Sequence, residues 1–179
     1  MRADLAIDPI ATLVESGRDL EQILVLQRRN REPTADGFVT VPHTPEILQA
    51  MHALMPSLIV RDGAGGIAGY ALAMAREAES MLPILAPMFA RLDTLDALRD
   101  RRWYVMGQVC VDEAWRGRGV FDALYAGHRA SYGGAFDVLV TEIATRNGRS
   151  IRAHARVGFA EIDRYRDATD EWSVVAWRW

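Results

Sequence analysis

The chain has 179 residues, of which 50% are hydrophobic and 25% charged, with a formal net charge of −3 and a pI near 5.8. Such a chain is typical of one globular domain, here residues 1–179, with a sizeable core. The acidic balance gives no reason to expect a nucleic-acid partner. A single cysteine, Cys110, excludes an internal disulfide and a cysteine-rich zinc site, and no metal is expected.

The chain also carries no membrane or export signal that we recognise. No apolar run approaches the ~20 residues that span a bilayer. Asp4 and Asp8 interrupt the apolar residues of the N-terminus, which is unlike a secretory signal. The sequence therefore predicts a cytoplasmic protein with no membrane partner.

Hydrophobic periodicity predicts an alternation of helices and strands in the N-terminal half. Ser16 and Thr44 are suitable N-caps, and Pro45 suits a first helical position. Apolar runs around a glycine-rich turn at 62–66 are typical of a hairpin. The expected elements are a strand at 11–14, a helix after Ser16, a loop at 32–44, a helix after Thr44, and strands at 57–61 and 67–76.

Residues 77–102 form an insertion of helical or irregular character that contains Pro83 and Pro87. Its apolar residues are suited to packing over another part of the chain or over a substrate. We interpret the segment either as a lid or substrate wall, or as an additional packing helix.

The C-terminal half predicts a strand–helix–strand–helix series followed by two strands. The expected elements are strands at 103–111 and 136–143, helices at 117–131 and 147–157, and final strands at 159–165 and 172–179. This order favours a parallel strand pair in an α/β sheet.

The turn after the first of these strands is the most informative segment. Gln108 to Val111 leads into Arg116-Gly117-Arg118-Gly119, which opens the next helix. Glycines let the backbone approach a ligand closely, and a helix N-terminus directs unpaired N–H groups and partial positive charge at it. The turn therefore predicts a phosphate-binding site.

Two motifs in this half resemble the GNAT superfamily of N-acetyltransferases. The family's Q/R-x-x-G-x-G/A turn is matched by Arg116, Gly117, Arg118, Gly119 and Val120, with Phe121 where glycine or alanine is usual. Its Asn-x-x-Ser helix ending in Gly-Phe is matched by Asn147, Ser150, Gly158 and Phe159. A lone RGRG would be weak evidence, so the pairing of the two motifs carries the inference.

The resemblance implies a GNAT-like mixed central sheet of about six to seven strands, flanked by helices, with splayed parallel motif strands. It implies acetyl-CoA as cofactor and direct transfer of the acetyl group to a primary amine in a ternary complex. Backbone N–H groups of Val109, Cys110 and Val111 would face the acetyl and pantetheine groups, and those of 117–121 the pyrophosphate. Asn147 and Ser150 would lie near the pantetheine, although Asn147 could equally be a plain helix cap.

Glu142 and His154 are the candidate catalytic residues. Glu142 ends an apolar strand and is a candidate general base, with a structural ion pair to Arg146 or Arg149 as the alternative. His154 occupies the position where many family members carry the tyrosine that protonates the leaving thiolate, and imidazole titrates near neutrality. Cys110, in an apolar strand, is interpreted as a small core residue rather than a nucleophile.

Other functions and partners stay open at this point. A non-catalytic acyl-CoA sensor, an RNA-contact module and an enzyme for longer acyl groups are alternatives. The acceptor is a small-molecule or peptide amine. Tyr104, Met106 and Gln108 alternate along the strand and are candidate lining residues of its pocket, with the opposite face of the strand as the alternative. Trp172, Trp177 and Trp179 make the last strand aromatic, which suggests core packing or a homodimer contact.

Overall fold

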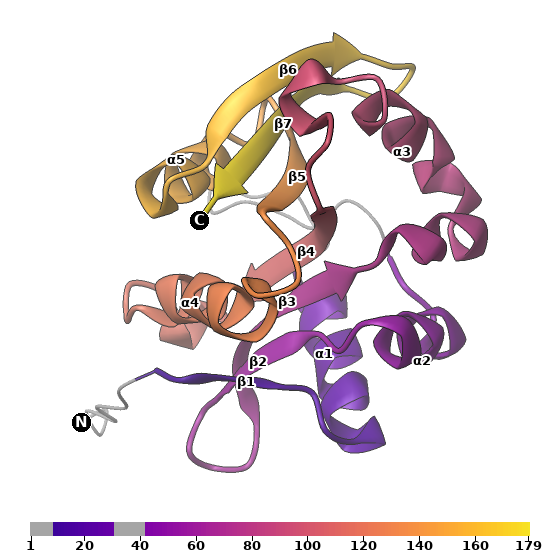
Figure 1. The fold of residues 1–179 in the computed structure, drawn as a ribbon. Helices are drawn as coiled ribbons and strands as arrows, with labels where there is room; N and C mark the ends of the chain where they lie inside the picture. Colours follow the sequence, from indigo (N-terminus) through magenta and orange to yellow (C-terminus); the bar gives the residue numbers. More distant parts are fainter. Residues whose placement is uncertain (1–8, 31–41) are drawn as a thin grey trace.

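A computed structural model of the chain describes residues 9–30 and 42–179. It contains one seven-stranded mixed sheet in the order β1-β2-β3-β4-β5-β7-β6 (Figure 1). The strands are β1 Ala11–Leu13, β2 Leu58–Arg61, β3 Ile67–Met74, β4 Trp103–Val111, β5 Val138–Ala144, β6 Ala160–Arg166 and β7 Glu171–Arg178. The α-helices are α1 Gly17–Arg29, α2 Pro45–Leu54, α3 Ala86–Leu92, α4 Val120–Tyr132 and α5 Gly148–Val157. The strand number and the mixed sheet confirm the predicted fold class.

The two N-terminal helices begin where their capping residues predict. The Ser16 hydroxyl accepts a hydrogen bond from the backbone N–H of Asp19, and the Thr44 hydroxyl accepts one from Ile47, each at 3.3 Å. Each cap satisfies one N–H that has no partner inside its own helix. The predicted loop at 32–44 lies mostly outside the described residues.

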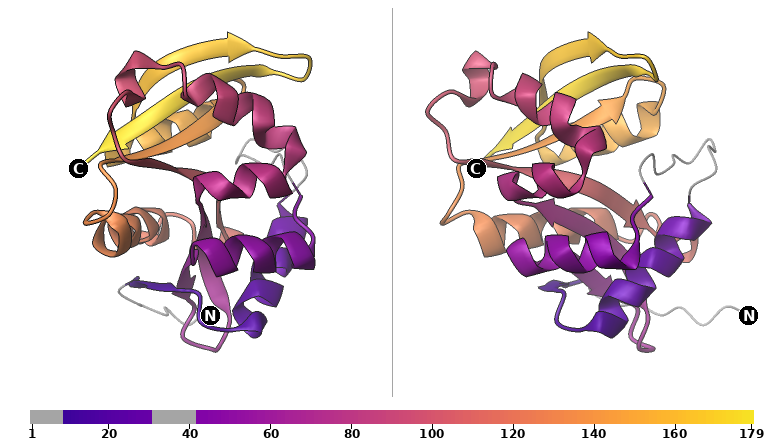
Figure 2. Two further views of the ribbon diagram at one scale, coloured as in Figure 1. Left: turned by 45° about the vertical axis from the view of Figure 1, so that its right-hand side comes forward. Right: turned by 90° about the vertical axis from the view of Figure 1, so that its right-hand side faces the viewer.

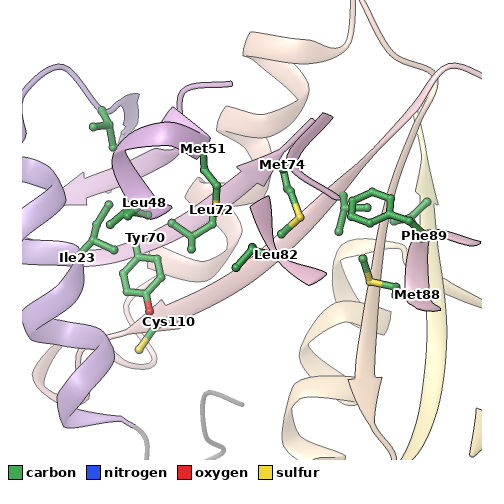
Figure 3. Packing of buried hydrophobic residues seen from close by; sticks show 14 of the residues in the cluster. Ile23, Leu48, Met51, Tyr70, Leu72, Met74, Leu82, Met88, Phe89 and Cys110 are labelled. Atoms are coloured by element: carbon green, nitrogen blue, oxygen red, sulfur yellow. The ribbon is translucent and has the colours of Figure 1, made fainter. Parts of the chain in front are cut away.

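Helices cover both faces of the sheet (Figure 2). On one face, α1, α2 and the insertion pack on β3 and β4, and Figure 3 shows part of this core. On the other face, α4 and α5 enclose a second core with Tyr104, Leu124 and Tyr125 at its centre. The sheet therefore has an α1 face and an α4 face, and these two names are kept below.

The insertion is a packed layer on the α1 face. Short 3₁₀ helices at Arg76–Met81, Pro83–Leu85 and Asp96–Leu98 flank α3. In α3, Met88, Phe89 and Leu92 are buried, and the Phe89 ring stacks on Trp103 at 6.4 Å. Burial of this kind supports the packing-helix interpretation over a lid.

β4 and β5 are parallel neighbours for only part of their length. Their pairing covers Trp103 with Val138 through Val105 with Val140 and then ends, although both strands continue. The backbone of β4 from Met106 onward consequently has β3 as its only paired neighbour among the described strands. This splayed arrangement was the central feature that the resemblance implied.

A β-bulge changes which side chains of β4 share a face. Leu72 pairs with Gln108 but Ala73 pairs with Met106, so Gly107 is the extra residue. A bulge reverses the alternation of side chains that follow it. Met106 therefore belongs to the α4-face core, whereas Gln108 contacts Tyr70 on the α1 face. The expectation that Tyr104, Met106 and Gln108 line one pocket was wrong for this reason.

Of the C-terminal tryptophans, Trp177 and Trp179 pack on the core of the chain itself, whereas the indole N–H of Trp172 donates to Asp167 in the β6–β7 turn. β7 lies between β5 and β6, so it is not an edge strand. Trp177 packs edge-on to Tyr125 at 6.1 Å and to Trp179 at 5.1 Å. The homodimer stays a prediction, and the packing of Trp177 and Trp179 inside the chain gives no support for it. Within the described ranges, no helix combines the length and the apolar character needed to cross a membrane.

Two buried histidines on the α4 face predict a loss of stability in mild acid. Burial lowers the pKa of His128 to about 3 and that of His154 to about 4. In the unfolded chain both titrate near ~6.5, so below that pH the unfolded state binds more protons. Stability is complete above about pH 6.5 and falls as the pH drops toward 4, by about 2 kcal/mol per histidine at pH 5. Urea unfolding at pH 7.5 and pH 5.0 measures the difference.

His128→Gln provides the control, because an amide keeps a hydrogen-bonding partner for Tyr104 but does not titrate. Its loss of stability between the two pH values is expected to be smaller than that of the parent by about 2 kcal/mol. Equal stability of the parent at both pH values would contradict the burial of neutral histidines.

Candidate active site

The turn between β4 and α4 has the backbone of a phosphate cradle. Gly117 and Gly119 have φ angles of 73° and 80°, in the left-handed region that side chains disfavour. Gly119 is the N-cap of α4 and has no side chain to satisfy the first N–H groups of the helix. Those N–H groups and the positive end of the helix dipole are therefore available to an anion.

A cavity of about 430 Å³ lies in front of this turn, between the splayed end of β4 and one face of α5. Its lining contains most of the predicted binding residues: Val109, Cys110, Val111, Arg116, Gly117, Gly119, Val120, Phe121, Asn147 and Ser150. It also contains residues that the sequence reading missed: Asn30, Trp115, Asp122, Arg149, Ala153 and Arg156. The structure thus brings the two sequence motifs to a single cavity.

Three arginines give the cavity positive charge. The Arg116 guanidinium donates to the side-chain oxygen of Asn30 at 2.9 Å and to the backbone carbonyl of Val111 at 3.3 Å. Arg156 pairs with Asp122 at 2.7 Å, and Arg149 lies two turns earlier on α5. The spacing of 149, 153 and 156 follows the helical period and could have revealed this face. Arg118, one of the predicted binding residues, does not line the cavity; its guanidinium lies 5.3 Å from the Trp115 ring.

Two backbone N–H groups of β4 face the cleft. Tyr70 pairs with Cys110 across β3 and β4, and the backbone N–H of Asp112 donates to Ala68 of β3 at 2.8 Å. Alternate residues of a strand point their N–H groups in opposite directions. The N–H groups of Val109 and Val111 therefore point away from β3, toward the cleft. The N–H group of Cys110 points toward β3. The expectation that this N–H group faces the acetyl and pantetheine groups was therefore wrong.

The Cys110 thiol is a core group. Its side chain lies beside Tyr70 on the α1 face (Figure 3), and the residue is 7% exposed. Burial raises the pKa of this thiol to about 12, so it stays protonated near neutral pH. The interpretation as a small buried residue rather than a nucleophile fits this environment.

The two departures from the family pattern, Phe121 and His154, contact each other. Phe121 turns its ring toward α5, where the ring centroids lie 5.2 Å apart and the ring planes are perpendicular. The same ring contacts Tyr125 at 4.9 Å. Phe121 consequently leaves the backbone of the turn open and forms part of the cavity wall over His154.

His154 is 1% exposed and does not line the cavity. Its Nδ1 lies 2.8 Å from the carbonyl oxygen of Ser150, and its Nε2 lies 2.5 Å from the Tyr125 hydroxyl. The carbonyl can only accept, so Nδ1 carries the proton and Nε2 accepts from Tyr125. Burial lowers the pKa of the ring to about 4. This geometry does not support direct protonation of a leaving group by His154.

Asn147 acts as a helix cap. Its side-chain oxygen accepts a hydrogen bond from the backbone N–H of Ser150 at 3.3 Å, at the start of α5. Both residues also line the cavity. The structure therefore contains the capping interaction, and the capped end of α5 borders the cavity.

Glu142 does not line the cavity that holds the arginines, and it lies on the opposite face of the sheet from α5. It is the second residue of β5 after the last pair with β4, on the α1 face together with Val140. The Tyr165 hydroxyl donates to its carboxylate at 2.5 Å, and burial raises the pKa of Glu142. Arg146, one candidate ion-pair partner, is 2.5 Å from Asp170. A half-buried carboxylate with a raised pKa is suited to accept a proton near neutral pH.

Comparison with known proteins identifies the fold. No protein-family model matches the chain, and no curated protein matches its sequence. Among solved structures, a GNAT superfamily phosphinothricin acetyltransferase from Sinorhizobium meliloti, in complex with acetyl-CoA, has a TM-score of 0.66 at 15% identity, covering 96% of this chain and 89% of that one. A GNAT family N-acetyltransferase from Escherichia coli, in complex with CoA, has a TM-score of 0.61 at 19% identity, covering 99% and 85%. A putative acetyltransferase from Salmonella typhimurium with acetyl-CoA has a TM-score of 0.65 at 16% identity, covering 96% and 94%. The fold of this chain is therefore the GNAT acetyltransferase fold.

Two glycine substitutions test the backbone of the turn. A Cβ at Gly117 would meet nothing within 4 Å, and the same is true of Gly134, which follows α4 and lacks a positive φ. Gly117→Ala is expected to lower the free energy of unfolding by about 1–2 kcal/mol, because alanine is strained at φ 73°. Gly134→Ala is expected to raise it by up to about 1 kcal/mol. Urea unfolding compares the two, and equal effects would show that the turn does not hold Gly117 in this conformation.

Proposed function

We propose that this chain is an N-acetyltransferase that uses acetyl-CoA to acetylate a primary amine, by direct attack in a ternary complex. One observation carries the proposal. The strands β4 and β5 part after Val105 and Val140, with a phosphate-type turn and arginines on one side and the carboxylate of Glu142 on the other. An anionic donor and an amine can thus approach the same gap from opposite faces of the sheet.

The donor set of the cavity fits acetyl-CoA. The N–H groups at the start of α4, together with Arg116, Arg149 and Arg156, suit a pyrophosphate or other phosphate group. The cleft-facing N–H groups of Val109 and Val111 suit the amide-bearing arm, which would pair with the strand edge as a peptide does. When bound, acetyl-CoA supplies an acetyl group activated as a thioester.

The residues of the chain then have distinct roles in the proposed reaction. The N–H group of Val109 or Val111 donates to the carbonyl oxygen on which negative charge develops. Glu142 accepts a proton from the amine, directly or through a water molecule, which makes the nitrogen nucleophilic. The Tyr165 hydroxyl holds the carboxylate in place. His154 and Tyr125 hold α4 and α5 together behind the cavity.

The leaving thiolate takes its proton from solvent in this mechanism. Among the described residues that line the cavity, none is a histidine or a tyrosine. That observation also favours one alternative function, an acyl-CoA sensor that binds the ligand without turnover. Release of free thiol in the presence of amines separates the two functions, because only the enzyme produces it.

The acceptor, the compartment and the partners are proposed as the sequence predicts them. The acceptor is a small-molecule or peptide amine, the compartment is the cytoplasm, and no nucleic-acid partner is invoked. Acyl groups longer than acetyl are a variant of the same chemistry that acyl-CoA competition would resolve.

Glu142→Gln tests the proposed base. The amide keeps the shape of the side chain but cannot take a proton, so kcat is expected to fall by about 10²–10⁴-fold. In the parent enzyme, kcat/KM is expected to rise with pH through the raised pKa of Glu142, because only the carboxylate is active. This acid limb should disappear in the variant. Steady-state assays with a free-thiol readout measure both effects.

Tyr165→Phe and Glu161→Gln serve as companion variants. Loss of the Tyr165 hydrogen bond, which lowers the pKa of Glu142, should move the acid limb to higher pH. Glu161 is a carboxylate on the edge strand β6, paired with Arg164 at 2.8 Å, and its removal should leave the profile unchanged. An unchanged kcat in Glu142→Gln would remove Glu142 from the mechanism.

A further inference from the structure

The insertion reaches the part of the sheet that carries the proposed base through an arginine. Three apolar side chains of α3 are buried on the α1 face, and Arg91 lies beside them in the last turn of the helix. The Arg91 side chain extends to β6, where its Nε pairs with the carboxylate of Asp163. Its guanidinium carbon lies 4.6 Å from the centre of the Tyr165 ring, which is a cation–π distance. The insertion is thus tied to two polar side chains of an edge strand.

The register of the sheet places these side chains on the same face as Glu142. Glu142 pairs with Val174 of β7, and Val174 pairs in turn with Asp163 of β6. Residues that pair across an antiparallel sheet share a face, and Val174 belongs to the core on the α1 face. Tyr165 follows Asp163 by two residues and packs against the same core. The proposed base, a second carboxylate and a phenol therefore lie together on the α1 face.

The Tyr165 hydroxyl connects Arg91 to the proposed base. It donates to Oε2 of Glu142 at 2.5 Å, which leaves Oε1 as the oxygen that the amine would use. Burial raises the pKa of Glu142, and the hydrogen bond from Tyr165 lowers it in part. A long side chain on an edge strand has several rotamers open to it, and holding it in one of them costs entropy. The guanidinium of Arg91 covers the Tyr165 ring and so favours the rotamer that reaches Glu142.

The positive charge of Arg91 also acts on the neighbours of Glu142. Burial and the hydrogen bond to Glu142 raise the pKa of Tyr165, so its hydroxyl keeps its proton, whereas the charge of Arg91 makes this hydroxyl a stronger donor. The hydrogen bond from Arg91 holds the pKa of Asp163 below its ordinary value. Asp163 is therefore an anion that Arg91 offsets. A further anion, Asp167 in the β6–β7 turn, raises the pKa of Glu142.

We infer that Arg91 is a positioning residue for the proposed base, because it holds the Tyr165 ring where the hydroxyl can bind the carboxylate of Glu142. This inference rests on the proposed acetyltransferase function and extends it to the insertion. α3 then does more than cover the α1 face, since it fixes a side chain of the neighbouring edge strand. Arg91 does not line the cavity for acetyl-CoA, so its effect falls on proton transfer and not on cofactor binding.

Arg91→Met tests this role, because methionine keeps an apolar contact with the Tyr165 ring but carries no charge and donates no hydrogen bond. The acid limb of kcat/KM is expected to move to higher pH by about half a unit to one unit, the effect of weakening one hydrogen bond to a carboxylate. The Kd for acetyl-CoA should stay unchanged. A free-thiol assay on the full chain, with n-butylamine and L-alaninamide and with rates expressed per unprotonated amine, measures the profile.

Nuclear magnetic resonance gives a second readout that needs no amine. The carboxyl carbon of Glu142 in ¹³C-labelled protein, assigned by its loss in Glu142→Gln, reports the titration of this group directly. Its midpoint should rise in Arg91→Met by the same amount as the acid limb. A change in folding alone would lower the rate at every pH but would not move this midpoint.

Arg76→Met is the matched control. Arg76 belongs to the same insertion, pairs with Asp93 and lies 5.5 Å from the centre of the Trp103 ring, so it makes the same two kinds of contact away from Glu142. Its replacement should lower the stability of the chain without moving the acid limb. Arg91→Lys keeps a cation for the ion pair and so preserves the fold, but an ammonium cannot cover a ring as a guanidinium does. It should give a smaller shift than Arg91→Met, in the same direction.

A double-mutant cycle separates positioning from a simple change of charge. All variants of the cycle carry Asp163→Asn, so that the loss of Arg91 uncovers no carboxylate on β6. In this background Arg91→Met should still move the acid limb, and the addition of Tyr165→Phe should leave Arg91→Met almost without effect, because the two residues act through one hydrogen bond.

An unchanged acid limb in both Arg91 variants, an equal shift in Arg76→Met, or a shift in Arg91→Met that persists in the Tyr165→Phe background would each overturn the inference. Those results would leave the acetyltransferase function in place. Absence of free-thiol release from the parent with both amines, in a protein that binds acetyl-CoA, would contradict the proposed function and with it the role of Arg91.

Discussion

The early end of pairing between β4 and β5 is the constraint on which the site depends. After Val105 and Val140 the two strands continue without pairing to each other, held instead by β3 and β7. A strand edge is normally a liability because its N–H and C=O groups invite other chains. Here the open edge lies between the helices of the two faces, and the N–H groups of Val109 and Val111 face the cavity. In the proposed mechanism, this gap lets the turn and the arginines on one face of the sheet act on the same reaction as Glu142 on the other face.

The two unusual residues of the motifs are accommodated together. Phe121 replaces a small residue in the turn, and His154 stands where a tyrosine is usual; their rings are in perpendicular contact. The aromatic ring therefore points at α5 rather than into the turn, and the histidine is a neutral buried link to Tyr125. Each substitution alone looks like a defect in an acetyltransferase. Because the two rings pack on each other, the backbone of the turn stays open. In the proposed mechanism, the leaving thiolate therefore takes its proton from solvent instead of from His154.

The sequence predicted the elements and the cavity better than the roles of single side chains. Caps at Ser16 and Thr44 and the two motifs predicted helices, strands and most of the residues that line the cavity, because these signals are local. The one-residue bulge at Gly107 depends on the pairing of β4 with β3 across the chain, so the face of Gln108 could not be read from alternation. The burial of His154 likewise depends on contacts with the rings of Tyr125 and Phe121, which come from another helix.

Hydrogen–deuterium exchange of the backbone amides tests the central claim most directly, since it reports on each N–H group with and without acetyl-CoA. The claim predicts that the ligand slows exchange at Val109, Val111 and the first residues of α4, while Cys110, whose N–H points toward β3, changes little. Protection of all of β4 alike would indicate general stabilisation. Unchanged exchange at Val109 and Val111, with the ligand demonstrably bound, would contradict the claim that the splayed edge of β4 holds the cofactor.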